Sequence, residues 1–512
     1  MKRLYIGWVL FCTLFSATVL YGQTATTSLR GAVKDPSGAL VPGATITLTN
    51  QVTGATQTTE TNAAGLYVFV QIPPSKYLIT VSASSFGDQS KTAQLLVNQP
   101  ATIDFTLSVQ ASSVTVDVSA TAQTLNTSDA SIGNSMGNEM IEAIPTETRS
   151  VPDLLALQPG VLYLPGADQA SDSRTGAVNG GRSDQGNVTL DGIDNNDQIS
   201  GAAFTGVLRE TQDSVQEFRV VTGGGNADSG RSSGAQVSMV TKGGTNKYHG
   251  AAYEYYRPTW VANDWFNKNS QVTSGDPNIP GKYIRNIFGA DLGGPIKKDK
   301  LFLFMNYEGW RQAENAQVSE TTPTADYKNG ILSYQNANGD RIQLQPGDVA
   351  TLDQDCTVVC NSSDYPNPPG PNPNVLDYFA SMPTANVPTV GGDASGGQAY
   401  NLGTYTFSSP HPQSQNTYLA RLDFQLTATQ SIFVRGQLQK DAISSSEQFP
   451  GQGPASTVVA NNRGIIAGHT WTIKPNLIND VRYGFIRAGG GTAGVGQGSY
   501  VDFRGISTPT AE

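Results

Sequence analysis

The sequence predicts a mostly β protein, with an N-terminal β-sandwich, a central α+β domain and then the first strands of an incomplete β-barrel. Near the N-terminus, short runs rich in Val, Thr and Ile alternate with turn signals, as in an all-β sandwich. Towards the C-terminus, longer segments alternate apolar and polar residues over about 9–11 positions, the length of strand that crosses a bilayer. No window after residue 25 holds about 18 consecutive apolar residues, so no transmembrane helix is expected.

Composition narrows the classes of partner and cofactor. The 512 residues include 32 Lys and Arg against 42 Asp and Glu, a net charge of −10, which gives no electrostatic support for binding nucleic acid. Only three His and three Cys are present. We therefore expect neither a metal site nor a cofactor.

Residues 1–23 have the pattern of a signal peptide. Lys2 and Arg3 precede an apolar run from residue 4 to residue 20, and small or polar residues follow at 22–25. An N-terminal membrane anchor is the alternative, although the run is marginal for a span. After cleavage the remaining cysteines are Cys356 and Cys360, and exported proteins can oxidise such a pair to a disulfide.

Residues 24–108 predict the sandwich. The segment 44–49 alternates with period two, turn signals stand at 35–38 and 62–65, and Pro73-Pro74 precedes another β-prone run. These motifs resemble the carboxypeptidase regulatory-like domain. A zinc carboxypeptidase needs two His and a carboxylate at the metal, and the sandwich segment contains no His, so we expect a non-catalytic accessory domain.

Residues 109–120 predict a linker with one β-prone stretch, formed by Val114, Thr115, Val116, Asp117 and Val118. The main chain of such a stretch can add as an edge strand to the sheet of a partner. Two interpretations stay open at this point. The stretch is either the last strand of the sandwich followed by linker, or a strand that a coupling partner recognises.

Residues 121–243 carry an ordered set of motifs. They include Leu-Gln-Pro-Gly-Val at 157–161, Asn-Gly-Gly-Arg at 179–182, Leu-Asp-Gly-Ile-Asp-Asn-Asn-Asp at 190–197, Gly-Arg-Ser-Ser-Gly-Ala-Gln-Val at 230–237 and Val-Thr-Lys-Gly-Gly-Thr-Asn at 240–246. The set resembles the plug domain of TonB-dependent receptors, in particular their Oar-like branch. This resemblance implies that 114–118 is a TonB-box-like strand and that a TonB-type energy-coupling protein of the inner membrane is the partner.

The plug-like motifs supply the candidate binding residues, which are Arg182, Asp191, Asp194, Asn195, Asn196 and Asp197. A run of carboxylates and amides suggests calcium, but an EF-hand loop requires Gly at the sixth position counted from Asp194, and that position is not Gly. A structural turn is the favoured interpretation.

Residues 244–512 predict the N-terminal part of a transmembrane β-barrel. The segment 418–426 places one apolar set and one polar set on opposite faces: Ala420, Leu422, Phe424 and Leu426 against Arg421, Asp423 and Gln425. Arg435, Gln437 and Gln439 form a similar polar face in the segment 432–439. A barrel with a wet lumen needs this alternation, although an exported soluble β-sandwich would also alternate and is the alternative.

Further strands are expected at about 248–257, 284–294, 300–310, 462–474 and 476–488. An aromatic cluster near one strand end is expected to form an interfacial girdle; its members are Tyr253, Tyr255, Tyr256, Trp260, Trp265 and Phe266. Residues 311–414, rich in Pro, Asn, Asp and Gly, predict a long extracellular loop that contacts ligand.

Closure of the barrel is a matter of strand number. Barrels that hold a plug have about 22 strands, many more than this segment supplies. An open sheet edge in hydrocarbon costs several kcal/mol for each bare N–H or C=O group. We therefore expect the sequence to be a fragment of a longer protein.

The sequence thus predicts an outer-membrane receptor that binds an external ligand and imports it with inner-membrane energy. The expected partners are the lipid bilayer, an unidentified extracellular ligand and the TonB-type protein. An adhesion or matrix protein on the same scaffold, without import, is the alternative. Enzyme activity is not expected, because the chain has no H-E-x-x-H motif and none of its three His has surroundings that suit a catalytic triad.

Overall fold

The computed structural model describes most of the chain. The described residues are 25–108, 130–146, 149–163, 176–182, 185–197, 204, 206–225, 234–262, 281–352, 370–387, 393, 399–474 and 477–494, together with the backbone of 114–116. The predicted signal peptide, Asp117, Val118, Cys356 and Cys360 lie outside this set, as do Trp265 and Phe266.

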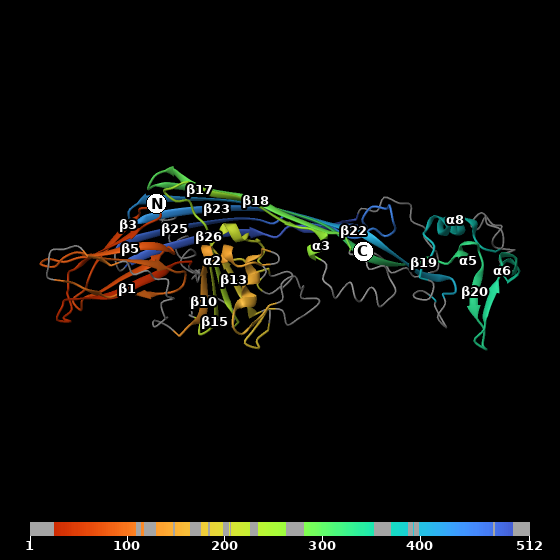
Figure 1. Ribbon diagram of the computed structural model, residues 1–512, viewed down its shortest axis with the longest axis horizontal. Helices are drawn as coiled ribbons and strands as arrows, with labels where there is room; N and C mark the ends of the chain where they lie inside the picture. Colours follow the sequence, from red (N-terminus) through yellow and green to blue (C-terminus); the bar gives the residue numbers. More distant parts are fainter. Residues whose placement is uncertain are drawn as a thin grey trace, which may run out of the picture.

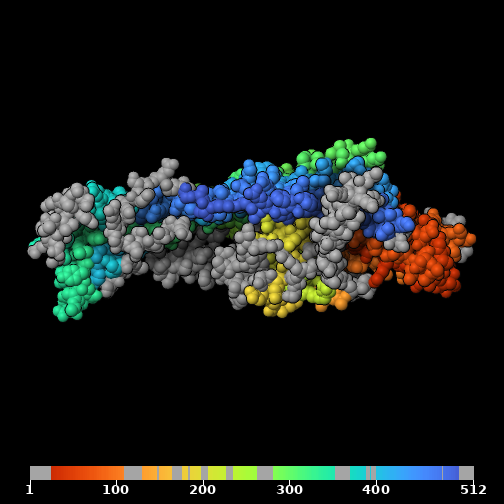
Figure 2. Space-filling view, turned by 180° about the vertical axis from the view of Figure 1, so that it is seen from behind, coloured from red at the N-terminus to blue at the C-terminus, as the bar shows by residue number. Residues whose placement is uncertain are grey.

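The molecule has four parts, three of them in line and the fourth beside the middle one (Figure 1). The N-terminal sandwich lies at one end, and a large sheet runs from it towards a small domain at the other end, which we call the cap. The residues between 130 and 241 form a compact central domain against one face of the large sheet, and Figure 2 shows this contact from behind. Within the described residues, no helix combines the length and the apolar composition needed to cross a bilayer.

The sandwich consists of two packed sheets. The first contains β1 (Thr27–Lys34), β4 (Leu66–Ile72), β7 (Ala101–Thr102) and β8 (Phe105–Thr106), and the second contains β2 (Thr45–Asn50), β3 (Thr56–Glu60), β5 (Ser75–Ser82), β6 (Gln89–Leu95) and β9 (Val114–Val116). Period-two alternation turns one face of each strand inward, so that Leu29, Ile46, Ile79 and Phe105 are buried between the sheets.

Strand β9 is an edge strand of the sandwich. It pairs in parallel with β6, matching Gln89, Ser90 and Lys91 to Val114, Thr115 and Val116. Val114–Val116 thus lie in the second sheet of the sandwich, and recognition of this stretch by a coupling partner stays a prediction.

The central domain is built on a five-stranded mixed sheet in the order β10-β15-β16-β13-β14. Its elements are β10 (Ile132–Gly137), α2 (Asn138–Ala143), η1 (Val151–Leu157), β11 (Val161–Leu162), β12 (Ala177–Val178), β13 (Asn187–Leu190), β14 (Ile193–Asp194), η3 (Gln212–Ser214), β15 (Val215–Gly223) and β16 (Gln236–Thr241). Its apolar core includes Ile141, Leu154, Leu190 and Phe218. The α+β prediction for this domain is confirmed.

The large sheet has nine strands, and all of its pairings are antiparallel. They are β17 (His249–Arg257), β18 (Tyr283–Lys297), β19 (Leu301–Pro323), β22 (Leu402–Thr427), β23 (Gln430–Ser444), β24 (Ser456–Ala460), β25 (Arg463–Lys474), β26 (Leu477–Arg487) and β27 (Gly490–Gly494), with α3 (Thr259–Ala262) after β17. The predicted strand positions are confirmed. Among the described residues β17 pairs with β18 alone and β26 with β25 alone, so the barrel sheet is not closed.

The two faces of the large sheet differ as the alternation predicts. Apolar side chains lie exposed on the face away from the central domain, among them Leu292, Met305, Tyr418, Leu422, Phe424, Val434, Leu438, Ile465, Val481, Tyr483 and Phe485. On the opposite face Arg435, Gln437 and Gln439 are buried against the central domain. A soluble sandwich would cover its apolar face, so this pattern favours the barrel interpretation.

Strands β19 and β22 are longer than the sequence indicates, which corrects the limits of the predicted loop 311–414. They have 23 and 26 residues and pair without interruption from Leu301 with Phe424 to Pro323 with Leu402. Near the middle of this pairing the outer face turns polar, where Arg311 donates to Asn416 at 2.8 Å. Main-chain pairing therefore continues beyond the apolar band. Alternation of apolar and polar residues identifies only that band, so the sequence does not reveal the rest of the two strands.

The cap lies between β19 and β22. It contains α5 (Ala325–Lys328), β20 (Leu332–Gln335), β21 (Arg341–Leu344), α6 (Pro346–Leu352) and α8 (Pro373–Ser381). Asn401, directly before the start of β22, joins the cap to that strand, because its side chain exchanges two hydrogen bonds with the backbone of Ser333 and also donates to Asp393.

The aromatic girdle is only partly as expected. Tyr256 and Trp260 are exposed. Tyr253 and Tyr255 are on the opposite face, where the Arg149 guanidinium lies over both rings at 5.3 and 4.0 Å from their centres, although Tyr255 also stays exposed. Consecutive strand residues point to opposite faces, so one strand cannot turn all of its aromatic side chains outward.

Candidate functional site

Asp191 lies at the centre of the contact between the central domain and the large sheet. It follows β13 in a two-residue turn, in which Asp191 and Gly192 have φ angles of 49° and 82°. Two successive positive φ values are typical of the tight turns that connect antiparallel strands, and Asp-Gly suits them. The turn places the Asp191 carboxylate on Thr241 of β16, which donates from its backbone N at 3.0 Å and from Oγ1 at 2.7 Å.

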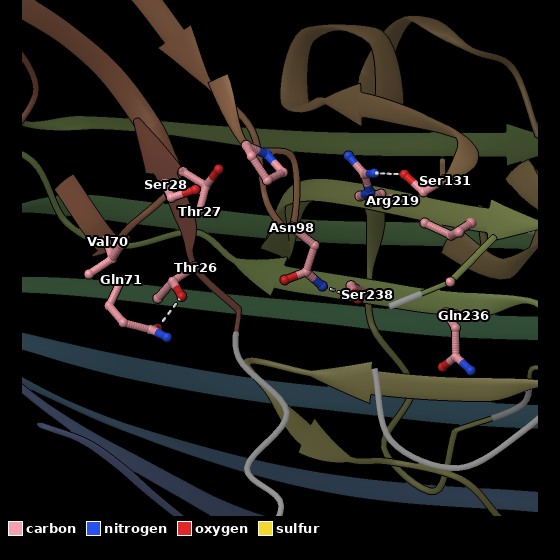
Figure 3. Close-up of a pocket in the computed structure, with 13 residues that line it drawn as sticks. Thr26, Thr27, Ser28, Val70, Gln71, Asn98, Ser131, Arg219, Gln236 and Ser238 are labelled. Atoms are coloured by element: carbon pink, nitrogen blue, oxygen red, sulfur yellow. Dashed lines mark hydrogen bonds between the residues drawn. The ribbon is translucent and has the colours of Figure 1, made fainter. Parts of the chain in front are cut away.

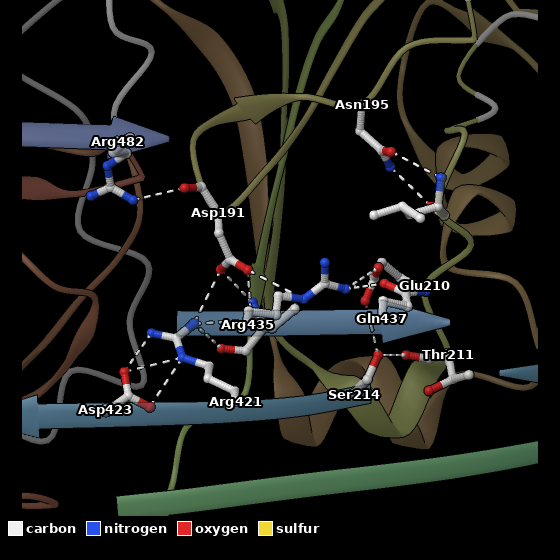
Figure 4. Close-up of polar contacts among 12 residues, drawn as sticks. Asp191, Asn195, Glu210, Thr211, Ser214, Arg421, Asp423, Arg435, Gln437 and Arg482 are labelled. Carbon is white, nitrogen blue, oxygen red and sulfur yellow. Dashed lines mark hydrogen bonds and ion pairs between the residues drawn. The ribbon is translucent and has the colours of Figure 1, made fainter. Parts of the chain in front are cut away.

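Three arginines from three strands of the large sheet converge on Asp191 (Figure 4). Arg421 of β22 donates to the carboxylate at 3.1 Å, and the Arg435 Nε atom of β23 lies 3.6 Å from it. Arg482 of β26 donates to the backbone carbonyl of Asp191 at 2.7 Å. Asp423 and Asp480 each pair with the arginine two residues away on the same strand, so the three arginines are balanced by three aspartates.

The segment 207–214 of the central domain makes a second polar contact with the sheet. Arg435 reaches past Asp191 to the buried carboxylate of Glu210 at 2.5 Å, and Ser214 donates to that carboxylate. Arg209 pairs with Asp441 of β23 at 2.8 Å, while its carbonyl accepts from Gln437. Burial raises the pKa of Glu210, although the Arg435 guanidinium acts in the opposite direction.

We call this contact the polar seam. Its members are Asp191, Arg209, Glu210 and Ser214 of the central domain and Arg421, Arg435, Gln437, Asp441 and Arg482 of the large sheet. Such a contact can hold the two domains together and still release them. Ion pairs and hydrogen bonds can be exchanged for water, whereas separating an apolar interface exposes surface that water solvates poorly. The seam is partly apolar, since Ile466 of β25 belongs to the core of the central domain. In the part of the chain that the structure describes, no three His, Cys, Asp or Glu side chains gather as a metal site requires.

The candidate residues from the sequence lie in different places. One is in the polar seam, three form a turn after it, and two are considered separately below. Asp191 is in the polar seam. Asn195 is buried and exchanges two hydrogen bonds of 2.9 Å with the backbone of Leu208, and Asp194 accepts from the backbone N of Asn196 at 2.9 Å. These hydrogen bonds hold the run in a turn, and any role of it in ligand contact stays a prediction.

Arg182 and Asp197 are not brought to Asp191 by any contact described here. Arg182 follows β12, and its backbone N donates to Gln185 Oε1 at 3.4 Å. Asp197 ends the described part of the segment 185–197. Their suggested roles in ligand contact stay predictions, as do those of the other candidates.

Strand alternation places Arg421 and Arg435 on the inward face but does not by itself reveal the polar seam. A usable signal was present, because Arg421-Leu422-Asp423 and Asp480-Val481-Arg482 put opposite charges on the same face of a strand. Glu210 carried no such signal, since its partner Arg435 is 225 residues away in sequence.

Comparison with known proteins gives matches over most of the chain. Residues 240–511 match the model of the outer membrane beta barrel domain, and residues 28–108 match the carboxypeptidase regulatory-like domain. The chain is 27% identical over 308 residues to the TonB-dependent transporter Oar of Myxococcus xanthus, which is 57% of this chain. It spans only 28% of the length of that relative.

Two solved structures are also similar to the chain. The outer membrane transporter YddB from Escherichia coli matches with a TM-score of 0.40 and 12% identity, over 69% of this chain and 38% of that one. The ferric enterobactin receptor PfeA from Pseudomonas aeruginosa matches with a TM-score of 0.37 and 10% identity, over 70% of this chain and 41% of that one.

Proposed function

Because the chain belongs to the outer membrane beta barrel domain family, we propose that it is the N-terminal part of an outer-membrane receptor that imports an external ligand. The central domain is its plug, the large sheet is part of the barrel wall, and a TonB-type protein supplies energy by pulling on the strand at 114–118. The relative in Myxococcus xanthus, described as a TonB-dependent transporter, supports this proposal.

The polar seam carries the proposal. A transporter plug must stay in the lumen at rest and yield to a pull, and the seam joins Asp191 and Glu210 to arginines of the wall through contacts that water can replace. If the central domain only filled the lumen, apolar packing would hold it at least as well, because replacing a buried ion pair with apolar groups is often neutral or stabilising.

The proposed orientation follows from the two ends of the sheet. Long connections of such barrels face outside the cell and short turns face the periplasm. The cap between β19 and β22 would then contact the ligand. The sandwich and the short turn at Asp299, to which Asn246 donates at 2.7 Å, would lie in the periplasm.

The experiment uses complete growth medium as the probe. Cells that carry the full-length protein are compared with cells that carry Val116→Pro, and mass spectrometry follows the disappearance of medium components with and without an uncoupler. We expect at least one component to be taken up only by energised cells with the unchanged strand. Val116→Ala is the matched control, because it keeps the backbone N–H on which strand addition depends.

Two outcomes would contradict import. Uptake that is unaffected by the uncoupler would remove the energy-coupling part of the proposal. A gene deletion that changes only the attachment of cells to surfaces, with no component dependent on the protein, would favour the adhesion alternative.

A further inference from the structure

The sandwich contacts the central domain through the residues that follow β6. The backbone N of Val97 donates to Glu217 Oε1 of β15 at 2.7 Å, and Asn98 Nδ2 donates to Ser238 Oγ of β16 at 3.1 Å. Gln99 Oε1 accepts from Arg219 of β15 at 3.0 Å. Three consecutive residues of one domain therefore bind two adjacent strands of the other.

These three residues, which we call the clasp, are held firmly on the sandwich side. Asn98 has a φ of 50°, and its backbone N donates to the carbonyl of Thr26 at 2.9 Å. Thr27 Oγ1 donates to the carbonyl of Gln99 at 2.6 Å. The start of β1 thus braces the clasp, so that a force on the sandwich is carried to the central domain.

The interface beneath the clasp is suited to opening. Its apolar part is small, a cluster of Ala25, Val97 and Val240. Beside it lies a cavity of about 180 Å³ with a mixed polar and apolar lining, whose polar residues include Asn98, Ser238 and Arg219 (Figure 3). Water in such a cavity can take over the hydrogen bonds of the clasp as the domains part.

The proposed coupling strand is attached to the same sandwich. β9 pairs with Gln89–Lys91 of β6, and the clasp begins two residues after the end of β6 at Leu95. A pull on β9 therefore acts on β6, and through β6 on the clasp, as well as along the chain that leads to β10.

We propose that the sandwich is a lock on the central domain: the clasp holds it at rest, and the energy-coupling partner, by drawing on β9, lifts the sandwich before the central domain moves. This inference rests on the proposed import function. It adds that the N-terminal domain bears the force first, instead of serving as a passive tether.

The first arm of the test needs no energy and no ligand. The sample is the full-length protein in outer membranes, with Cys356 and Cys360 replaced by Ser. It carries Val240→Cys, whose side chain lies under Val97, and a membrane-impermeant maleimide is added to label this cysteine. We expect slow labelling in the resting state and labelling at least tenfold faster when Val97→Asp is added, because this buries an unpaired carboxylate in the apolar cluster with Ala25 and Val240. Glu217→Ala removes the acceptor of the Val97 backbone N and should also speed up labelling. Glu217→Gln keeps an acceptor, so labelling should remain slow.

A matched control reports on the fold of the central domain. Val188→Cys is buried in its core and not under the sandwich, so it should stay unlabelled when only the sandwich leaves. Fast labelling at both positions in Val97→Asp would overturn the lock, because the sandwich would then be needed for the fold itself. Fast labelling of Val240→Cys in the unchanged sandwich would overturn it too, because the clasp would not be closed at rest.

The second arm separates the lock from the import function. In energised cells Val240→Cys should label several-fold faster than after addition of an uncoupler, and Val116→Pro should abolish the difference. Energy-dependent uptake with Val240→Cys still protected would overturn the lock and leave import standing. Energy-dependent labelling without uptake of any medium component would support the lock and overturn import.

Discussion

At the scale of single residues, the molecule depends on a few buried charges that meet across a domain boundary. Arg435 and Asp191 are each only 1% exposed, and Glu210 is 2% exposed. Burying an isolated charge is costly, so each of these groups requires the others in place. The three together join the central domain to one strand of the wall.

Asp191→Asn should weaken this junction. The change leaves the buried guanidinium of Arg435 with Glu210 as its remaining carboxylate partner, and breaking a buried pair typically costs on the order of 3 kcal/mol. Urea unfolding of the detergent-solubilised full chain should therefore show a lower midpoint. Asp194→Asn is the control, because Asp194 is exposed and accepts local turn contacts; an equal loss in both variants would contradict a special role for the seam.

Glu217 gives the contact of the sandwich a pH dependence. Burial raises its pKa from an ordinary 4.5 to about 8, while its bond from Val97 N and the nearby Arg219 charge act in the opposite direction. The docked state thus holds the proton more tightly than the open one. This contribution to docking is complete below about pH 4.5 and is lost as the pH rises to about 8.

The distance between two spin labels can measure how the docked fraction of the sandwich depends on pH. One label is attached at Ser37→Cys on the sandwich and the other at Lys298→Cys on the short turn after β18. The protein otherwise lacks Cys356 and Cys360. The docked fraction should fall between pH 5 and pH 8.5. Glu217→Gln cannot ionise and should give a flat profile. A profile of the same slope in the Gln variant would show that another group titrates.

At the scale of elements, strand alternation decides which face meets lipid. Along β22 the apolar residues at even positions are exposed, and Arg421 and Asp423 at odd positions turn to the central domain. This periodicity is local, which is why the sequence predicts both faces correctly. The ends of β19 and β22 lie beyond the apolar band, where alternation no longer distinguishes strand from loop.

Leu422→Arg should impair assembly of the full chain in lipid vesicles. An arginine facing the middle of the bilayer costs about 2–4 kcal/mol in such barrels, and the cost falls towards the interfaces. Leu426→Arg, one residue before the end of β22, should therefore be tolerated better. Heat-modifiable mobility on gels measures the folded fraction; equal effects at the two positions would argue against a membrane-spanning β22.

At the scale of the whole molecule, the two ends are specialised differently. The sandwich lies at the end with short turns and touches the central domain, while the cap stands at the far ends of β19 and β22 (Figure 1). The proposed ligand contact and the proposed coupling contact are thus separated by the full length of the sheet. The central domain between them is the part able to connect the two.

Replacing residues 325–400 with a short Gly-Ser link should separate ligand contact from assembly. The pairing of β19 with β22 continues to Pro323 and Leu402, so the link closes a preformed ladder and the protein should still reach the membrane. Uptake of the protein-dependent medium component should fall at least tenfold. Retained uptake would exclude the cap as the ligand-contact region, and replacement of residues 337–339 alone serves as the control.

The sequence by itself determined the properties that depend on neighbours along the chain. These are the β-rich class, the positions of β17, β18, β23, β25 and β26, the two faces of β22, the Asp191-Gly192 turn and the resemblance to receptor plugs. Each rests on periodicity, turn chemistry or a contiguous motif, and these act over a few residues.

Tertiary structure alone decided which distant groups meet. Arg421 and Asp191 are separated by 230 residues, and Val97 and Glu217 by 120. Such pairs form only because the fold brings buried surfaces together, and no local pattern encodes the partner of a charge that leaves water. The partners that meet in the polar seam and the clasp therefore could not be read from the sequence, although the pairs Arg421-Asp423 and Asp480-Arg482 marked two strands of the seam.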